Sequence, residues 1–150
     1  MSDSRELRDL YQEVILEHSK KPRNFGELAT ANHKAEGFNP LCGDHYTVFV
    51  NVKDGAIEEI GFTGAGCAIS KASASMMTQT LKGKSTTEAD AIFTNFHDLV
   101  TGHDSDVKTL GKLGVFAGVS EYPLRVKCAT LAWHAMRAAL RGDQEAISTE

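Results

Sequence analysis

An alternating stretch near the middle of the chain constrains the fold more than any other segment. From His45 to Val52 every second residue is apolar, which is the period of a β-strand with one buried face. The Asp54-Gly55 pair that follows is typical of a tight hairpin turn, and Ile57 to Thr63 supplies a returning strand. A third strand, at the edge, is predicted over Asn32 to Phe38. An antiparallel sheet of this size needs a helical layer to bury its apolar face.

Four segments with a helical period can supply that layer. They are Asp3–Lys20, Ala68–Leu81, a helix opened by the capping-box sequence Ser85–Glu88, and Leu124–Arg141. The glycine-interrupted stretch from Val107 to Val119 is harder to assign, with a short helical turn favoured around Leu110 to Phe116. We therefore predict an α+β fold, with a small antiparallel three-stranded sheet and helices packed on one side.

Length and charge narrow the possible functions. The chain has 150 residues and a formal net charge of −4, so we expect one domain spanning residues 1–150 and no basic surface for nucleic acid. The longest apolar runs are far too short for a membrane span, and the polar start carries no targeting pattern. The expected location is the reducing cytoplasm, where free thiols persist. Residues 143–150 are expected to form a frayed tail.

The chain has three cysteines, which are the strongest candidates for a functional site: Cys42, Cys67 and Cys128. An odd number without a C-x-x-C pair excludes a disulfide framework, a zinc ribbon and a thioredoxin-type motif. Cys42 lies in a turn before a strand, and Cys67 ends a turn containing Gly64 and Gly66 that opens a helix. Cys128 is expected in the first turn or so of the last helix. Helix N-termini favour thiolates, the form of cysteine that binds metals and attacks sulfur.

Whether the three thiols meet depends on the fold. A free cysteine often serves as a small apolar filler, and for Cys128 this alternative carries equal weight. If the thiols converge, they select zinc or an iron–sulfur unit, and zinc needs a fourth ligand. Asp44 is the nearest candidate, because His45 should face away from it on the strand. His134 lies about 9 Å along the last helix from Cys128, too far for a ligand from the same helix end.

Two alternatives to a three-thiol metal site have less support: ligands among the other histidines, and an enzyme that uses a single catalytic thiol. No motif surrounds the remaining histidines, which are expected at the surface: His18, His33, His97 and His103. A Cys–His hydrolase would use one nucleophile and leave two cysteines and Asp44 without a role.

Three cysteine motifs in order resemble those of a known family. They are Asn39–Asp44 (NPLCGD), Gly64–Ser70 (GAGCAIS) and Arg125–Ala129 (RVKCA). With the segment from Leu10 to Gly26, they resemble the U-type iron–sulfur assembly proteins, a family of IscU and NifU N-terminal-like domains with a SufE/NifU-like fold. The resemblance covers about Leu7 to about Leu140. Because Lys127 stands where the IscU-like scaffold branch has a histidine, the chain is more similar to the SufU branch.

The SufU branch implies a zinc-dependent sulfurtransferase in iron–sulfur cluster biogenesis. The resemblance implies Zn²⁺ held by Cys42, Asp44, Cys67 and Cys128, with Cys42 as the acceptor of persulfide sulfur. It implies the pyridoxal-phosphate (PLP)-dependent cysteine desulfurase SufS as sulfur donor, and downstream Suf cluster-assembly proteins as further partners. Arg125, one helical turn before Cys128, is either a catalytic group that stabilises the thiolate or persulfide, or a solvated arginine. Two alternatives remain: a scaffold that assembles a [2Fe–2S] cluster on the same ligands, and a structural-zinc adaptor that only activates the desulfurase.

The mixed ligand set suggests how such a site opens. Asp44 would be the hard ligand among soft ones and thus a plausible one to be displaced. Our hypothesis is that a partner side chain takes a zinc position on docking and frees Cys42, while Cys67 and Cys128 stay bound.

Overall fold

The sheet at the centre of the molecule has the predicted antiparallel core. The computed structural model describes residues 4–142 and 147–148. Its strands are β1 (His33–Asn39), β2 (Asp44–Lys53), β3 (Ala56–Ala65) and β4 (Ile147–Ser148). They lie in the order β3-β2-β1-β4, with antiparallel pairing among the first three and β4 parallel to β1. The predicted three-stranded sheet is confirmed, and β4 adds a short strand that the sequence did not predict. The expected frayed tail otherwise lies outside the described residues.

Two tight turns join these strands. Asp54 and Gly55 both have positive φ angles, 53° and 76°, as the mirror-image hairpin turn predicted from this pair requires. Between β1 and β2, residues 40–43 form a second turn, and Asn39 pairs with Asp44 across its base. Gly43 takes a left-handed φ of 72° there. Side chains of directly paired residues lie on the same face of a sheet, so Asn39 and Asp44 both point to the buried face.

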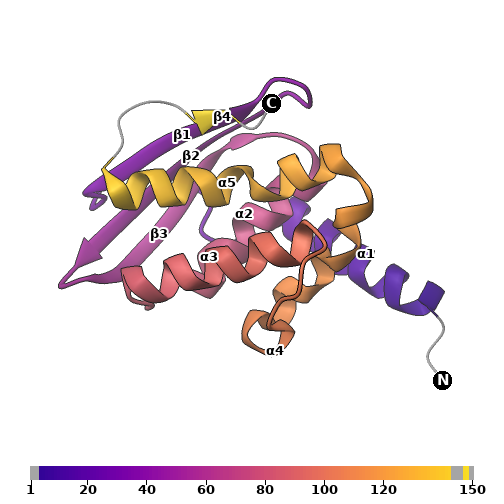
Figure 1. Ribbon diagram of the computed structural model, residues 1–150. Coiled ribbons are helices and arrows are strands. Elements are labelled where there is room, and N and C mark those ends of the chain that lie inside the picture. The colour runs from indigo at the N-terminus through magenta and orange to yellow at the C-terminus, as the bar shows by residue number, and fades with distance from the viewer. Residues whose placement is uncertain (1–3, 143–146, 149–150) are drawn as a thin grey trace.

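Helices cover that face. The helices α2 (Ala68–Leu81) and α5 (Pro123–Arg141) contact the sheet directly. Around them pack α1 (Ser4–Lys20), α3 (Thr86–Val100), α4 (Val107–Leu110) and the 3₁₀ segment η1 (Gly111–Glu121). Figure 1 shows α2, α3 and α5 on the same side of the sheet, with α5 running along it. Ser85 caps α3 in a complete capping box with Glu88, as predicted. Asp3, where the first helix was expected to begin, lies outside the described residues.

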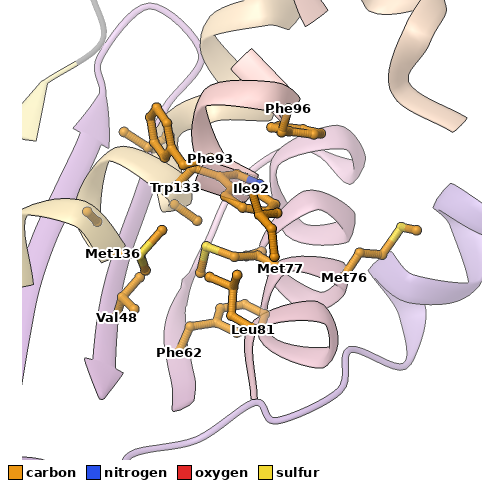
Figure 2. Packing of buried hydrophobic residues seen from close by; sticks show 14 of the residues in the cluster. Val48, Phe62, Met76, Met77, Leu81, Ile92, Phe93, Phe96, Trp133 and Met136 are labelled. Carbon is orange, nitrogen blue, oxygen red and sulfur yellow. The ribbon is translucent and has the colours of Figure 1, made fainter. Parts of the chain in front are cut away.

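The core lies between the sheet and these helices. Figure 2 shows side chains from β2, β3, α2, α3 and α5 meeting in one cluster, with Met77 near its centre. The Trp133 ring of α5 stacks on Phe96 of α3, with centroids 4.6 Å apart, and its indole N–H donates to Ser73 Oγ at 3.0 Å. Ser73 Oγ in turn donates to the carbonyl of Ala129. Because the buried polar atoms of this trio are paired, α2 and α5 are held in one relative position.

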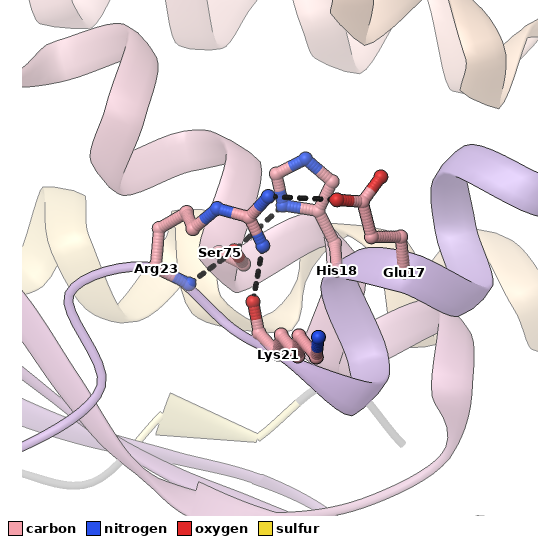
Figure 3. A network of polar contacts seen from close by, with 5 residues as sticks. All are labelled: Glu17, His18, Lys21, Arg23 and Ser75. Atoms are coloured by element: carbon pink, nitrogen blue, oxygen red, sulfur yellow. Dashed lines mark hydrogen bonds and ion pairs between the residues drawn. The ribbon is translucent and has the colours of Figure 1, made fainter.

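His18 is buried, so the surface prediction for this histidine is wrong. Its residue is 6% exposed, and its Nδ1 lies 2.8 Å from Ser75 Oγ of α2 (Figure 3). Ser75 Oγ also accepts the backbone N–H of Arg23, and the Arg23 guanidinium pairs with Glu17 at 3.0 Å. His18 falls on the apolar stripe of α1, so helical period was the better guide than the absence of a motif.

The helices of residues 4–142 include none with the length and apolar character that a bilayer crossing requires.

Candidate metal centre

The first thiol of the site, Cys42, is carried by the β1–β2 turn. The backbone N–H of Cys42 donates to the Asn39 carbonyl at 3.2 Å, and Leu41 N donates to Asn39 Oδ1 at the same distance. These two bonds close the turn and leave the Cys42 side chain exposed. Asp44, at the far side of the turn, is 1% exposed. One short hairpin therefore presents an accessible sulfur and a buried carboxylate side by side.

A second turn, between β3 and α2, supplies Cys67 as the N-cap residue of α2. Its sulfur accepts a hydrogen bond from Ser70 N at 3.4 Å, and its own backbone N–H donates to Asp44 Oδ1 at 2.9 Å. Gly64 has φ +133°, and a Cβ there would lie 2.1 Å from the His45 carbonyl oxygen. A Cβ on Gly66 would lie 2.4 Å from Asp44 Oδ1. The two glycines therefore make room for the β2 strand and its carboxylate.

The third thiol comes from α5. Cys128 lies early in the second turn of that helix, close to the predicted position in the first turn or so. The helix N-terminus therefore favours a thiolate at Cys67, the N-cap residue of α2, more than at Cys128. The Cys128 residue is 3% exposed. Its sulfur accepts a hydrogen bond from Asn39 Nδ2 at 3.8 Å. The alternative interpretation of Cys128 as a small apolar filler does not account for this contact with a polar side chain.

The fold brings three of the four predicted ligands together. Ligand atoms of Cys42, Asp44 and Cys128 all lie within 4.8 Å of one another. Among the described residues Cys67 is not part of this group, and it is linked to the group by its backbone N–H, which donates to Asp44 Oδ1 at 2.9 Å. Within the described part of the chain, Asp44 Oδ2 is the buried side-chain oxygen that has no hydrogen-bond partner. A buried carboxylate oxygen without a partner is costly unless a cation or proton meets it, so Cys42, Asp44 and Cys128 form a candidate metal site.

The thiols influence each other's protonation. The hydrogen bond from Cys128, with further bonds from Ser70, lowers the pKa of Cys67 to about 6. The same contact with Cys67, together with burial, raises the pKa of Cys128. Burial likewise raises the pKa of Tyr46, whose hydroxyl lies 2.9 Å from Ser70 Oγ beneath the site. At neutral pH the metal-free centre therefore favours a thiolate at Cys67 and a protonated thiol at Cys128.

Other predicted residues lie elsewhere. The Arg125 guanidinium is stacked over the Tyr122 ring, 4.5 Å from its centroid, so its action on the thiols stays a prediction. His45 is exposed on the opposite face from Asp44, as expected, and lies 3.8 Å from Glu36. His134 packs against the Phe93 ring, away from the thiols.

Sequence reasoning missed the polar groups that hold the site. Asn39 is fully buried and touches Cys128, while Ser70 and Tyr46 form a hydrogen-bonded pair below Cys67. A signal for Asn39 was present, because Asn before Pro40 is typical of a side chain that bonds its own turn. Nothing in the local sequence points to Tyr46, which occupies an ordinary inward position on β2.

Comparisons with known proteins agree with this geometry. The family model for the NifU-like N-terminal domain matches residues 10–129. The chain is 41% identical over 136 residues to the iron-sulfur cluster assembly scaffold protein IscU of Streptococcus pyogenes, covering 90% of this chain and 85% of that protein. It is 39% identical over 145 residues to the zinc-dependent sulfurtransferase SufU of Bacillus subtilis, covering 96% and 98%. A crystal structure of a SUF-system scaffold protein from Fervidobacterium islandicum superposes with a TM-score of 0.83 at 34% identity, covering 89% of this chain and 98% of that one.

Proposed function

The chain belongs to the family of NifU-like N-terminal domains that serve iron–sulfur cluster assembly, and from that membership we propose that it is a zinc-dependent sulfurtransferase. The proposed sulfur donor is the persulfide of a PLP-dependent cysteine desulfurase such as SufS, and cluster-assembly proteins of the Suf type would consume the sulfur. The observation that carries the proposal is the buried, unpartnered Asp44 Oδ2 beside one exposed and one buried thiol.

Three thiolates and one carboxylate form a donor set that suits zinc. Cys42, Asp44, Cys67 and Cys128 would hold the ion, since soft thiolates favour zinc over the harder divalent cations. When bound, zinc would keep its thiolate ligands deprotonated at neutral pH. The relative from Bacillus subtilis carries zinc dependence in its name, which supports this choice of metal.

Cys42 and Cys67 are both exposed, and Cys42 is the proposed acceptor. Cys128 is buried, and the Cys67 sulfur is engaged as the cap of α2. Cys42 stands on the outer turn, beside Leu41, which is 62% exposed. A persulfide carried on a partner's cysteine can reach Cys42 without any rearrangement of α2 or α5.

The proposed transfer conserves electrons. The Cys42 thiolate attacks the outer sulfur of the donor persulfide, a new S–S bond forms at Cys42, and the S–S bond of the donor breaks. The donor cysteine leaves as a thiolate and takes up a proton from solvent. Cys42 then carries the persulfide, and no external oxidant or reductant is consumed.

A second candidate is a scaffold that builds a [2Fe–2S] cluster on the same ligands. The similarity to the IscU scaffold protein of Streptococcus pyogenes favours it. Thiolates also bind iron well, so the donor set alone does not separate the two functions. Metal analysis of freshly purified protein does: zinc near one equivalent supports the transferase, and iron with acid-labile sulfide supports the scaffold.

The decisive test is a single-turnover sulfur transfer from a cysteine desulfurase, read by peptide mass spectrometry. We expect one additional sulfur atom on the Cys42 peptide of the zinc-loaded protein, and none after Cys42→Ala. Leu41→Ala, in the same exposed turn, is the matched control and should still accept sulfur. A wild-type protein that accelerates the desulfurase but gains no sulfur would be an adaptor, and the transferase proposal would fail.

A further inference from the structure

The three sulfurs of the centre differ in the hydrogen bonds that they accept. Cys67 Sγ receives the backbone N–H of Ser70 at 3.4 Å, and Cys128 Sγ receives the side-chain N–H of Asn39 at 3.8 Å. Within residues 12–142, no nitrogen donates to Cys42 Sγ at hydrogen-bonding distance. An N–H bond to a thiolate stabilises its charge and makes the sulfur a weaker nucleophile.

Asn39 has a second contact that links it to Cys42. Its Oδ1 accepts the backbone N–H of Leu41 at 3.2 Å, which closes the turn that carries the exposed thiol. Its Nδ2 points the other way, to Cys128. The side chain is fully buried and sits opposite Asp44 across the base of the hairpin. The Asn39 carboxamide thus contacts both the turn that carries Cys42 and the sulfur of Cys128.

We propose that Asn39 is a positioning residue that keeps Cys128 in the centre as an unreactive sulfur and fixes the turn that presents Cys42. The proposal rests on the proposed function in that it explains why Cys42, and not a neighbouring thiol, is the acceptor. Asn39 donates a hydrogen bond to the buried Cys128 sulfur, and the Ser70 backbone N–H donates one to the Cys67 sulfur. From the residues that the structure describes, the Cys42 sulfur accepts no such bond and keeps its full nucleophilicity.

Substitution by aspartate separates the two contacts of Asn39. Asn39→Asp keeps an oxygen that accepts the Leu41 N–H, but it replaces the donor to Cys128 with a carboxylate oxygen. Asn32→Asp is the control for the same pair of contacts at an exposed position, because Asn32 uses Oδ1 as acceptor and Nδ2 as donor, both to Val52, at the opposite end of β1. Asn39→Ser introduces no buried charge, can still cap the turn, and is too short to reach the sulfur.

The experiment uses zinc-loaded protein without any desulfurase. Zinc affinity is measured by competition with a chromogenic chelator, and limiting iodoacetamide is followed by peptide mass spectrometry for each thiol. In the wild type we expect Cys42 to react first. In Asn39→Asp and Asn39→Ser we expect zinc affinity to fall about tenfold and Cys128 alkylation to rise about tenfold relative to Cys67. Asn32→Asp should behave as the wild type.

The thiol-resolved rates separate positioning from general loss of structure. A merely structural role for Asn39 would raise the reactivity of Cys67 and Cys128 together and lower thermal stability with and without zinc. Wild-type zinc affinity and an unchanged order of alkylation in both variants would overturn the proposal. If Asn39→Asp does not fold, Asn39→Ser decides alone. Because no sulfur donor is present, the zinc and alkylation results for Asn39 do not depend on whether Cys42 accepts sulfur. The sulfur-transfer assay likewise does not depend on the role of Asn39.

Discussion

Replacing Gly66 by alanine should damage the metal centre without touching any proposed ligand. A Cβ at this position would lie 2.4 Å from Asp44 Oδ1, 2.7 Å from Ser70 Oγ and 2.8 Å from the Tyr46 hydroxyl. An unstrained carbon–oxygen contact is about 3.3 Å, so the carboxylate must retreat by about 1 Å. Asp44 Oδ1 accepts the Cys67 backbone N–H at 2.9 Å, and that bond cannot survive such a shift.

The cost of Gly66→Ala can be worked from these contacts. Overpacking at a buried position costs about 1–3 kcal/mol, and loss of a hydrogen bond to a carboxylate costs about 1.5–3 kcal/mol. Since the two penalties partly overlap, we expect the metal-free protein to lose about 3 kcal/mol of unfolding free energy. For a domain of this size that corresponds to a fall in Tm of about 6–12 °C. Zinc affinity should fall about 10–100-fold, because the displaced group is a proposed ligand.

The assay combines thermal unfolding of metal-free protein by circular dichroism with zinc competition against a chelator. Gly118→Ala is the matched control, because a Cβ on Gly118 meets nothing within 4 Å and its backbone is outside the left-handed region. If Gly66→Ala matched Gly118→Ala in both Tm and zinc affinity, the close approach of Asp44 to the β3–α2 turn would be refuted.

Three further predictions concern the rest of the fold. Burial, with the charges of His97 and Arg137, lowers the pKa of His134 from 6.5 to about 4. Between these two pH values the imidazole is protonated in the unfolded chain and neutral in the folded chain. Stability should therefore fall by up to about 3 kcal/mol as pH drops from 6.5 to 4, and urea titrations of His134→Gln should show a smaller fall. His18→Ala should cost about 2–3 kcal/mol in urea unfolding, because it opens a cavity between α1 and α2 and removes the partner of Ser75. Ser85→Ala should cost about 1 kcal/mol, seen as a fall in Tm of about 2–4 °C, since it breaks the capping box with Glu88.

Each of these has a control within the chain. His103→Ala, at an exposed loop position, should leave the urea midpoint unchanged, and a His18→Ala variant that also kept the wild-type midpoint would contradict the burial argument. An unaltered pH slope in His134→Gln would remove that residue from the acid response. Ser105→Ala, at a half-buried loop position that caps no helix, should keep the wild-type Tm, and a Ser85→Ala variant that did the same would contradict the capping argument.

Local chemistry accounts for the elements that were predicted correctly. The alternation from His45 to Val52 and the Asp54-Gly55 pair act over a few residues, and the structure places β2, the turn and β3 where they predicted. The Ser85–Glu88 box is likewise read from four neighbouring positions. The segment from Val107 to Val119 resisted prediction because short 3₁₀ turns have little period of their own and form by packing against α3 and α5.

The sequence by itself determined which donor atoms this protein can offer and in which local setting each one stands: one sulfur in a turn, one at a helix start, one in a helix. Only the tertiary structure decided that Cys42, Asp44 and Cys128 meet. Cys42 and Cys128 lie far apart along the chain, and their convergence depends on α5 packing along β1 and β2. The tertiary structure also decided that Gly66 makes room for Asp44, that Asn39 reaches Cys128, and that His18 is buried. Such contacts are set by the free energy of burying a common core, which sums over the whole chain, so no local pattern records them.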